Sequence, residues 1–129
     1  MAQVKIYGLS NALAPIRTEL SDVIHSCVRD AFGLPEDKRF HRFIALADAD
    51  FIYPSDRSER YTIVEFTIFE GRSEESRKRL IRLLYERTAQ RLELAPEDLE
   101  ISILEIPRGN WGIRGKPGDE LELSYDVDV

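Results

Sequence analysis

The chain has 129 residues, of which 43% are hydrophobic and 33% charged, and its formal net charge is −6. This length and composition fit one globular domain with its own core. The acidic balance argues against nucleic acid as the main partner, because phosphate binding needs clustered lysine and arginine. No apolar run is long enough to cross a membrane, and the first five residues lack the apolar stretch of a secretory signal. A single cysteine, Cys27, cannot form an internal disulfide, so we expect a cytoplasmic protein.

One segment of this acidic chain is strongly basic. Six cations fall within residues 77–91, where Glu86 is the only acidic side chain: Arg77, Lys78, Arg79, Arg82, Arg87 and Arg91. Clusters of this kind are usually the solvated face of a helix, and we interpret it as such.

The first half of the chain predicts a strand, a helix and a second strand. Residues 4–7 alternate between apolar and polar side chains, which is typical of a strand, and residues 8–14 read as a turn. Pro15 suits the first turn of a helix that Gly33 ends. The apolar positions of this helix fall at the spacing of a helix packed on a sheet: Ile16, Leu20, Val23, Ile24, Cys27, Val28, Ala31 and Phe32. The second strand is predicted at about residues 40–47, and it is apolar on both faces apart from His41 and Arg42.

The second half repeats this order after a loop over residues 48–60, in which residues 51–53 are predicted to be extended. A strand is predicted over residues 61–69 and another over residues 99–106. The helix between them begins after Ser73, a good N-cap, and carries a second apolar stripe: Leu80, Ile81, Leu84, Tyr85, Thr88 and Leu92. A glycine-rich segment then leads to an acidic tail, which we expect to pair as an edge strand near residues 121–125.

The two halves match at an offset of 61 residues. Residues 34–37 (Leu-Pro-Glu-Asp) correspond to residues 95–98 (Ala-Pro-Glu-Asp) after the second helix. We therefore predict a single α/β (α+β) domain over residues 1–129, with a pseudo-repeat at 3–47 and 61–106 and a C-terminal extension at 107–129. Two tandem β-α-β units would form one four-stranded sheet with both helices on one face. The other face would still need cover, and oligomerisation is the simplest cover.

Three motifs occur in order: Phe-Glu-Gly-Arg-Ser at residues 69–73, Ala-Pro-Glu-Asp at 95–98, and Trp-Gly-Ile-Arg-Gly at 111–115. Together they resemble the tautomerase superfamily. The second half is similar to a 4-oxalocrotonate tautomerase subunit, and the whole chain is similar to fused, double-length members such as malonate semialdehyde decarboxylase. The resemblance covers about residues 3–115 and implies a tautomerase-like homotrimer.

The resemblance also implies where the catalytic base would lie. Members of the superfamily use an amino-terminal proline, exposed by removal of the initiating methionine, as a base or an acid on a small keto acid. Residue 2 of this chain is alanine. Removal of Met1 would leave the primary amine of Ala2 at about the same point. An α-amino group begins near pKa ~7.7–8.0, so modest desolvation or a nearby arginine would bring its pKa to ~7.

Three binding residues follow from the resemblance, and each has a structural alternative. Arg72 corresponds to the substrate-binding arginine of the glycine-arginine turn, although it could instead pair with Glu70 or Glu74. Arg39 corresponds to another carboxylate-binding arginine, although charged turns usually hold surface ion pairs of little energetic weight. Trp111 corresponds to the aromatic residue that lines the pocket, and an interface anchor is the alternative, compatible role.

The chain departs from the malonate semialdehyde decarboxylase pattern at two further places. Lys38 stands where that enzyme has its catalytic aspartate, which argues against the same decarboxylation. Phe69 and Glu70 stand where a second arginine would lie, so a monocarboxylic substrate is favoured over a dicarboxylic one. His25 and His41 have no metal-ligand spacing, and neither a metal nor a cofactor is implied.

Two hypotheses follow. The chain is either a weak keto-enol tautomerase of a small 2-oxo carboxylic acid, or a non-catalytic trimer that binds a small anion or a protein partner. In the first, pockets lie at the subunit boundaries of the trimer, Arg72 and Arg39 bind the carboxylate, and the Ala2 amine moves the proton. Neither nucleic acid nor a membrane is an expected partner.

Overall fold

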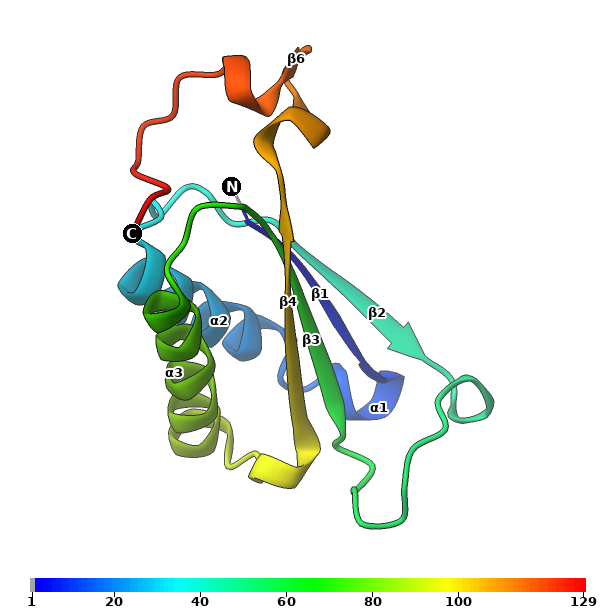
Figure 1. The fold of residues 1–129 in the computed structure, drawn as a ribbon. Coiled ribbons are helices and arrows are strands. Elements are labelled where there is room, and N and C mark those ends of the chain that lie inside the picture. Colours follow the sequence, from blue (N-terminus) through cyan, green and yellow to red (C-terminus); the bar gives the residue numbers. More distant parts are fainter. Residues whose placement is uncertain (1) are drawn as a thin grey trace.

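The computed structural model describes residues 2–129 and contains one four-stranded sheet with helices against one face (Figure 1). Its strands are β1 (Ala2–Leu9), β2 (His41–Leu46), β3 (Thr62–Phe69) and β4 (Leu99–Ile106), in the spatial order β2-β1-β3-β4. The outer pairs, β1 with β2 and β3 with β4, are parallel, and the central pair is antiparallel. This topology confirms the predicted α+β fold class.

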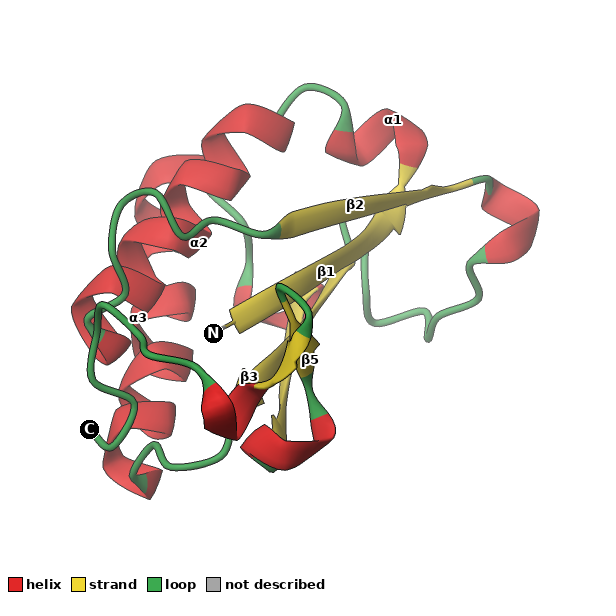
Figure 2. Cartoon of the chain, turned by 90° about the horizontal axis from the view of Figure 1, so that it is seen from above, coloured by secondary structure: helices red, strands yellow, loops and turns green. Residues whose placement is uncertain are grey.

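Three α-helices accompany the sheet: α1 (Ser10–Leu13), α2 (Arg17–Phe32) and α3 (Glu74–Leu92). The long helices α2 and α3 lie side by side on the same face of the sheet (Figures 1 and 2). Their predicted apolar stripes form the core, where Leu20, Ile24 and Leu84 have no exposed surface. Burial of these side chains, at roughly 1.5–3 kcal/mol each, holds the helices on the sheet.

The ends of the long helices follow local rules that the sequence predicts. Gly33 ends α2 in the left-handed conformation, at φ 70°. Ser73 caps α3, because its Oγ accepts a hydrogen bond from the Ser76 backbone N–H at 3.1 Å.

The turn predicted over residues 8–14 is wrong, because most of this segment forms α1. Leu13 is fully buried in the core and fixes this short helix against the sheet. Gly8 makes room for it, since a Cβ atom at this position would lie 2.9 Å from Leu13 Cγ.

The strand register matches in the two halves. Val4 pairs with His41 and Glu65 pairs with Ser102, which are the positions equated by the offset of 61 residues. This register supports the duplication of a β-α-β unit, which remains our proposal.

The C-terminal part is not the edge strand that the sequence predicts. A two-stranded hairpin, β5 (Gly112–Ile113) with β6 (Lys116–Pro117), follows β4, and its turn holds Arg114 at φ 50° and Gly115 at φ 86°. Residues 121–129 have no regular structure. The alternating apolar side chains of this segment pack against the protein instead of forming a strand. Val127 is 3% exposed, and Tyr125 packs against the main core.

Short 3₁₀ turns connect the remaining segments: Asp48–Asp50, Pro96–Asp98, Arg108–Asn110 and Gly118–Glu120. The loop predicted between β2 and β3 is observed, but residues 51–53 are not a strand. Phe51 stacks instead on Tyr61, with ring centroids 5.6 Å apart.

The second face of the sheet carries no helix. Gln3, Lys5 and Tyr7 of β1 point to it, and Leu104 of β4 is 60% exposed. On α3, the basic cluster forms ion pairs, among them Arg87 with Asp30 at 2.6 Å. Within residues 2–129, no helix is both long and apolar enough to cross a membrane. A cytoplasmic location stays a prediction.

Candidate functional site

The start of β1 and the end of β3 meet at one end of the sheet. Ala2 lies opposite Ile68 and is 4% exposed, and it belongs to the same core cluster as Phe32. The loop after α2, the β5–β6 hairpin and the C-terminal segment come together at this end (Figures 1 and 2). Chain segments distant in sequence can therefore contribute to one site here.

Arg72 lies in the turn that follows β3 and is buried, at 3% exposure. Its Cζ atom lies 4.7 Å from the centroid of the Phe32 ring. Among residues 2–129, none of its three guanidinium nitrogens has a hydrogen-bond partner. The alternative pairing with Glu74 is not observed, since that carboxylate bonds Lys78 at 3.0 Å.

A buried cation without a partner is unusual and costly, because burial removes its hydration. Burial lowers the pKa of the Arg72 guanidinium, and the positive charge of Arg108 adds to this lowering. The nearby acids Asp126 and Asp128 act in the opposite direction. Arginine nevertheless stays protonated in proteins. Stacking on Phe32 offsets about 1–2 kcal/mol of the burial cost, and a bound anion would offset more.

Tyr125 is partly buried and packs against the core cluster that contains Phe32, the ring on which Arg72 stacks. Its hydroxyl oxygen also lacks a hydrogen-bond partner among the described residues. Burial raises the pKa of Tyr125, whereas the charge of Arg72 lowers it. At neutral pH the phenol therefore keeps its proton, and this corner of the core contains two kinds of unused donor, N–H and O–H. A carboxylate is the complementary acceptor.

The C-terminal segment, defined here as residues 123–129, covers this corner. The carbonyl oxygen of Val129 accepts hydrogen bonds from the Ser73 hydroxyl at 3.0 Å and the Ser76 hydroxyl at 2.6 Å. Val127 is buried in a small cluster with Phe69. These contacts of Val127 and Val129 anchor the residues that follow Tyr125 and so hold Tyr125 in place.

A small hollow lies outside Tyr125. Its volume is about 170 Å³, and its lining residues are Lys38, Arg114, Glu122, Leu123, Ser124 and Tyr125. Within residues 2–129, neither Lys38 nor Arg114 forms an ion pair within 4.0 Å. These two cations would attract an anion toward the mouth of the site.

Arg39 and Trp111 line two different hollows. Gln3 and Phe40 line both, so the hollows adjoin each other, and Gln3 follows Ala2 directly in the chain. Arg39 already pairs with Asp22 at 2.6 Å, so part of its charge is committed to the protein. Trp111 lines the second hollow, of about 260 Å³, and packs edge-on against a neighbouring ring at 5.0 Å. Arg72 lines neither hollow. The predicted site residues thus gather at one end of the sheet, but not in one open pocket.

The two histidines lie beside Arg39. His41 Nδ1 is 2.8 Å from Ser21 Oγ, and His25 Nε2 is 2.9 Å from the Glu36 carbonyl oxygen. Burial, helped by the positive charge of Arg39, lowers the pKa of His41 to about 4. Burial also lowers the pKa of His25. Both rings are neutral at pH 7 and contribute no positive charge to the site.

Sequence reasoning missed Tyr125 and Arg114 as site residues. Arg114 belongs to the glycine-rich motif at residues 111–115, where only its turn position sets it apart. Tyr125 was part of the alternation that predicted an edge strand, and its approach to Arg72 depends on tertiary packing.

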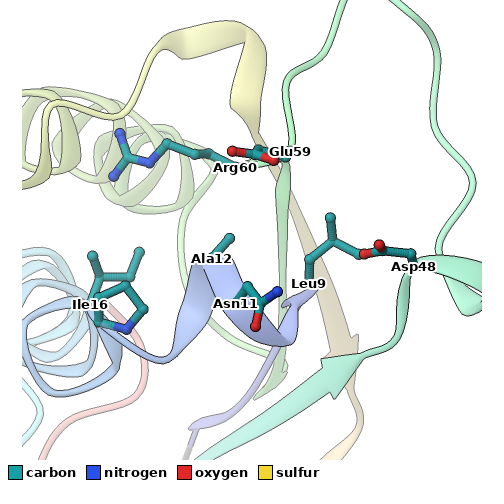
Figure 3. Close-up of a pocket in the computed structure, with 8 residues that line it drawn as sticks. Leu9, Asn11, Ala12, Ile16, Asp48, Glu59 and Arg60 are labelled. Carbon is teal, nitrogen blue, oxygen red and sulfur yellow. The ribbon is translucent and has the colours of Figure 1, made fainter.

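Another hollow, of about 340 Å³, lies at the opposite end of the sheet (Figure 3). The hollow that contains Arg39 is of similar size, at about 400 Å³. The lining of the hollow at the opposite end includes Leu9, Asn11, Asp48 and Arg60. The Arg60 guanidinium donates to the carbonyl oxygens of Leu92, at 3.0 Å, and of residue 93, at 3.1 Å. Because the end of α3 satisfies this cation, Arg60 is not left free to bind an anion in this hollow.

Comparison with known proteins places this fold among tautomerases. The family described as tautomerase enzyme matches residues 38–114. The 2-hydroxymuconate tautomerase of Pseudomonas putida is 36% identical over 59 residues, which cover 46% of this chain and 94% of that protein. The structure of malonate semialdehyde decarboxylase aligns with a TM-score of 0.79 at 20% identity, over 92% of this chain and 99% of that one. A fused 4-OT, an asymmetric trimer, aligns with a TM-score of 0.78 at 20% identity, over 91% and 96%.

Proposed function

Because the chain belongs to the tautomerase family, we propose that it interconverts the keto and enol forms of a small 2-oxo carboxylic acid. The observation that carries this proposal is the buried guanidinium of Arg72, which lacks a partner among the described residues. A substrate carboxylate is the ligand that would satisfy it. One such cation favours a monocarboxylic substrate.

The Ala2 amine is the proposed base once Met1 has been removed. In the direction from keto to enol, the amine takes a proton from carbon 3 of the bound acid, and the carbonyl oxygen gains a proton from water. The ammonium then returns its proton to the hydroxide left by that water, which restores the neutral amine. The reverse direction returns the proton to carbon 3. A neutral amine is needed for the first step, and desolvation at this end of the sheet would favour the neutral form.

Arg39 and Trp111 have proposed supporting roles at the subunit boundary. Trp111 and Phe40 would form an apolar wall, and Arg39 would add positive charge beside it. We further propose a homotrimer, which would cover the helix-free face of the sheet. The trimeric fused 4-OT and the 60% exposed Leu104 support this assembly. Light scattering of the purified protein would test it, with a trimer expected for the wild type and a smaller species for Leu104→Lys.

A second candidate function is anion binding without catalysis. The observation that favours it is the alanine at residue 2, since the family mechanism as implied by the resemblance uses proline. Ala2→Pro separates the two candidates. A preserved pocket would gain activity from the secondary amine, whereas a pocket that only binds anions would not.

The test of the first candidate is an enol ketonisation assay. Untagged protein, shown by its mass to lack Met1, is mixed with the enol form of phenylpyruvate, and the loss of enol absorbance is followed. We expect a rate well above buffer that falls to the buffer rate after acetylation of the Ala2 amine. Lys78→Ala, on the exposed side of α3, is the matched control and should keep the full rate. A wild-type rate equal to buffer would contradict the proposal for this substrate.

A second assay addresses the number of carboxylates. The rates with a monocarboxylic enol and with 2-hydroxymuconate, the substrate named for the Pseudomonas relative, are compared at equal concentration. A higher kcat/KM for the dicarboxylic compound would contradict the assignment of a single buried arginine to the substrate.

A further inference from the structure

We propose that Tyr125 is a ligand-binding residue of the Arg72 site, and that the C-terminal segment which carries it must swing away to admit the ligand. The inference rests on the proposed function for the class of ligand, a small carboxylate. It adds a binding residue and an entry route. Its readout is binding, which can be measured without turnover.

Arg72 and Tyr125 both carry buried hydrogen-bond donors that are not used. The Tyr125 hydroxyl and the three guanidinium nitrogens of Arg72 are all buried, and within residues 2–129 none of them has a partner. A buried donor that stays unpaired costs about 1–3 kcal/mol, and more when it is charged. Two such neighbours are explained together by one acceptor with two oxygens, because a carboxylate accepts from a guanidinium and a phenol at once.

A ligand needs access to the buried Arg72 guanidinium. Arg72 is 3% exposed, so a ligand cannot reach the guanidinium while its cover is in place. Part of that cover is the C-terminal segment. Asp128 lies so close to the turn before Arg72 that a Cβ atom on Gly71 would be 2.6 Å from its Oδ1 atom. The hollow lined by Lys38, Arg114 and Tyr125 lies outside this cover and provides the approach.

The C-terminal segment is attached to the rest of the protein by a limited set of contacts. Apart from the packing of Tyr125, the segment makes a short list of tertiary contacts. Val127 is buried and Leu123 is partly buried, Asp128 pairs with Arg108 at 3.6 Å, and the Val129 carbonyl oxygen accepts hydrogen bonds from Ser73 and Ser76. The segment forms no strand pairing, and its other backbone bonds are internal, such as Val129 N–H to the Val127 carbonyl at 3.0 Å. A segment with so few tertiary contacts opens at a small fraction of the cost of global unfolding. The neighbouring cations at its outer side would then draw the anion in.

The chain contains its own reporter for this motion. Trp111 is the only tryptophan, and it packs with Phe69, Val127 and Tyr125 in one small cluster. Its fluorescence should therefore change when the segment moves or when Tyr125 changes its contacts. Stopped-flow mixing with pyruvate, a small 2-oxo monocarboxylate, gives both the dissociation constant and the rate constants.

Two substitutions test the binding residue. We expect Tyr125→Phe to raise the Kd for pyruvate about threefold to tenfold, while the fold and the Trp111 signal persist. We expect Arg72→Lys to raise it by more than tenfold. If Tyr125→Phe binds pyruvate as tightly as the wild type while Arg72→Lys binds weakly, the role of Tyr125 is overturned and the anion site stands. If Arg72→Lys also binds normally, or the wild type does not bind at all, the proposed substrate site fails with it.

Val127→Ala tests the entry route. The substitution loosens the segment equally in the free and the bound protein, so association and dissociation should both accelerate about fivefold with little change in Kd. Val28→Ala, in the α2 core and 2% exposed, is the matched control for a general loss of packing and should leave both rates unchanged. Equal rates for Val127→Ala and the wild type would overturn the gating role of the segment, even if Tyr125 proves to bind the ligand.

Discussion

The two ends of the sheet are built from corresponding pieces of the chain, but the arginine at each end differs in its hydrogen bonding. Under the proposed offset of 61 residues, Asn11 in the short helix α1 after β1 corresponds to Arg72 in the turn after β3. At the far end, Arg60 is satisfied by the carbonyl oxygens that end α3. At the near end, Arg72 is buried and has no partner among residues 2–129.

This difference underlies our proposal that Arg60 has a structural role and Arg72 a binding role. A buried, unpaired cation costs the fold stability, and an apolar side chain of similar volume is usually neutral or stabilising in its place. The presence of this cation at one end therefore supports the proposal that Arg72 binds an anionic ligand. Among residues 2–129, none that lines the hollow at the far end is such a group.

The largest expected effect comes from Arg72→Met. We expect pyruvate affinity and enol ketonisation to fall at least a hundredfold, because the anion loses its only buried cation. We also expect the free energy of unfolding to rise by about 1–4 kcal/mol, since the desolvation cost disappears. Urea denaturation measures the second effect. A clear loss of stability would mean that Arg72 holds the fold together, which would contradict the functional interpretation.

Arg60→Met is the matched change at the far end. It removes two hydrogen bonds to the end of α3, so the free energy of unfolding should fall by about 1–2 kcal/mol. Pyruvate affinity should stay at the wild-type value. The comparison of the two ends breaks down if Arg60→Met weakens pyruvate binding as much as the Arg72 variant.

The neutral His41 predicts a pH dependence of stability. Its pKa in the folded protein is about 4, below the ordinary value of 6.5, and the groups that face it are Arg39, His25 and Asp22. Between these values the unfolded chain binds more protons than the folded one, so stability falls as pH decreases from 6.5 to 4. We expect His41→Gln to remove about 2 kcal/mol of this loss. Unfolding curves at pH 7, 5.5 and 4.5 measure it. Parallel pH profiles for variant and wild type would contradict the burial of a neutral ring.

The smallest expected effect comes from Asn11→Arg, which places a cation at the position that corresponds to Arg72. Asn11 is exposed, and no C-terminal segment covers that end. The new side chain would stay solvated and would change pyruvate affinity less than twofold. Creation of a second binding site, visible as a doubled stoichiometry in calorimetry, would show that the cover is not needed.

Much of the fold could be predicted because its signals are local. The apolar stripes of α2 and α3, the Ser73 cap and the glycine at the end of α2 depend on residues within a few positions of each other. The helix α1 was missed because it has four residues and is fixed by Leu13 against Gly8, which is a tertiary contact. The edge strand at residues 121–125 was predicted wrongly because alternation does not distinguish a strand from an irregular segment that packs every second side chain.

The site could be predicted only in part for the same reason. Arg72 and Trp111 lie in motifs that can be identified in the sequence, and the structure places both at the end of the sheet that contains Ala2. The burial of Arg72, its lack of a partner and the neighbouring Tyr125 depend on a segment more than fifty positions away in the chain. The commitment of Arg39 to Asp22 likewise depends on how α2 lies beside the loop that precedes β2.

The most direct measurement is a crystal structure of the protein, without Met1, grown with pyruvate. We expect the pyruvate carboxylate within hydrogen-bond distance of the Arg72 guanidinium and the Tyr125 hydroxyl, with carbon 3 facing the Ala2 amine. Pyruvate found in the hollow beside Arg60, or bound at neither end while Arg72 stays covered and unpaired, would contradict this expectation.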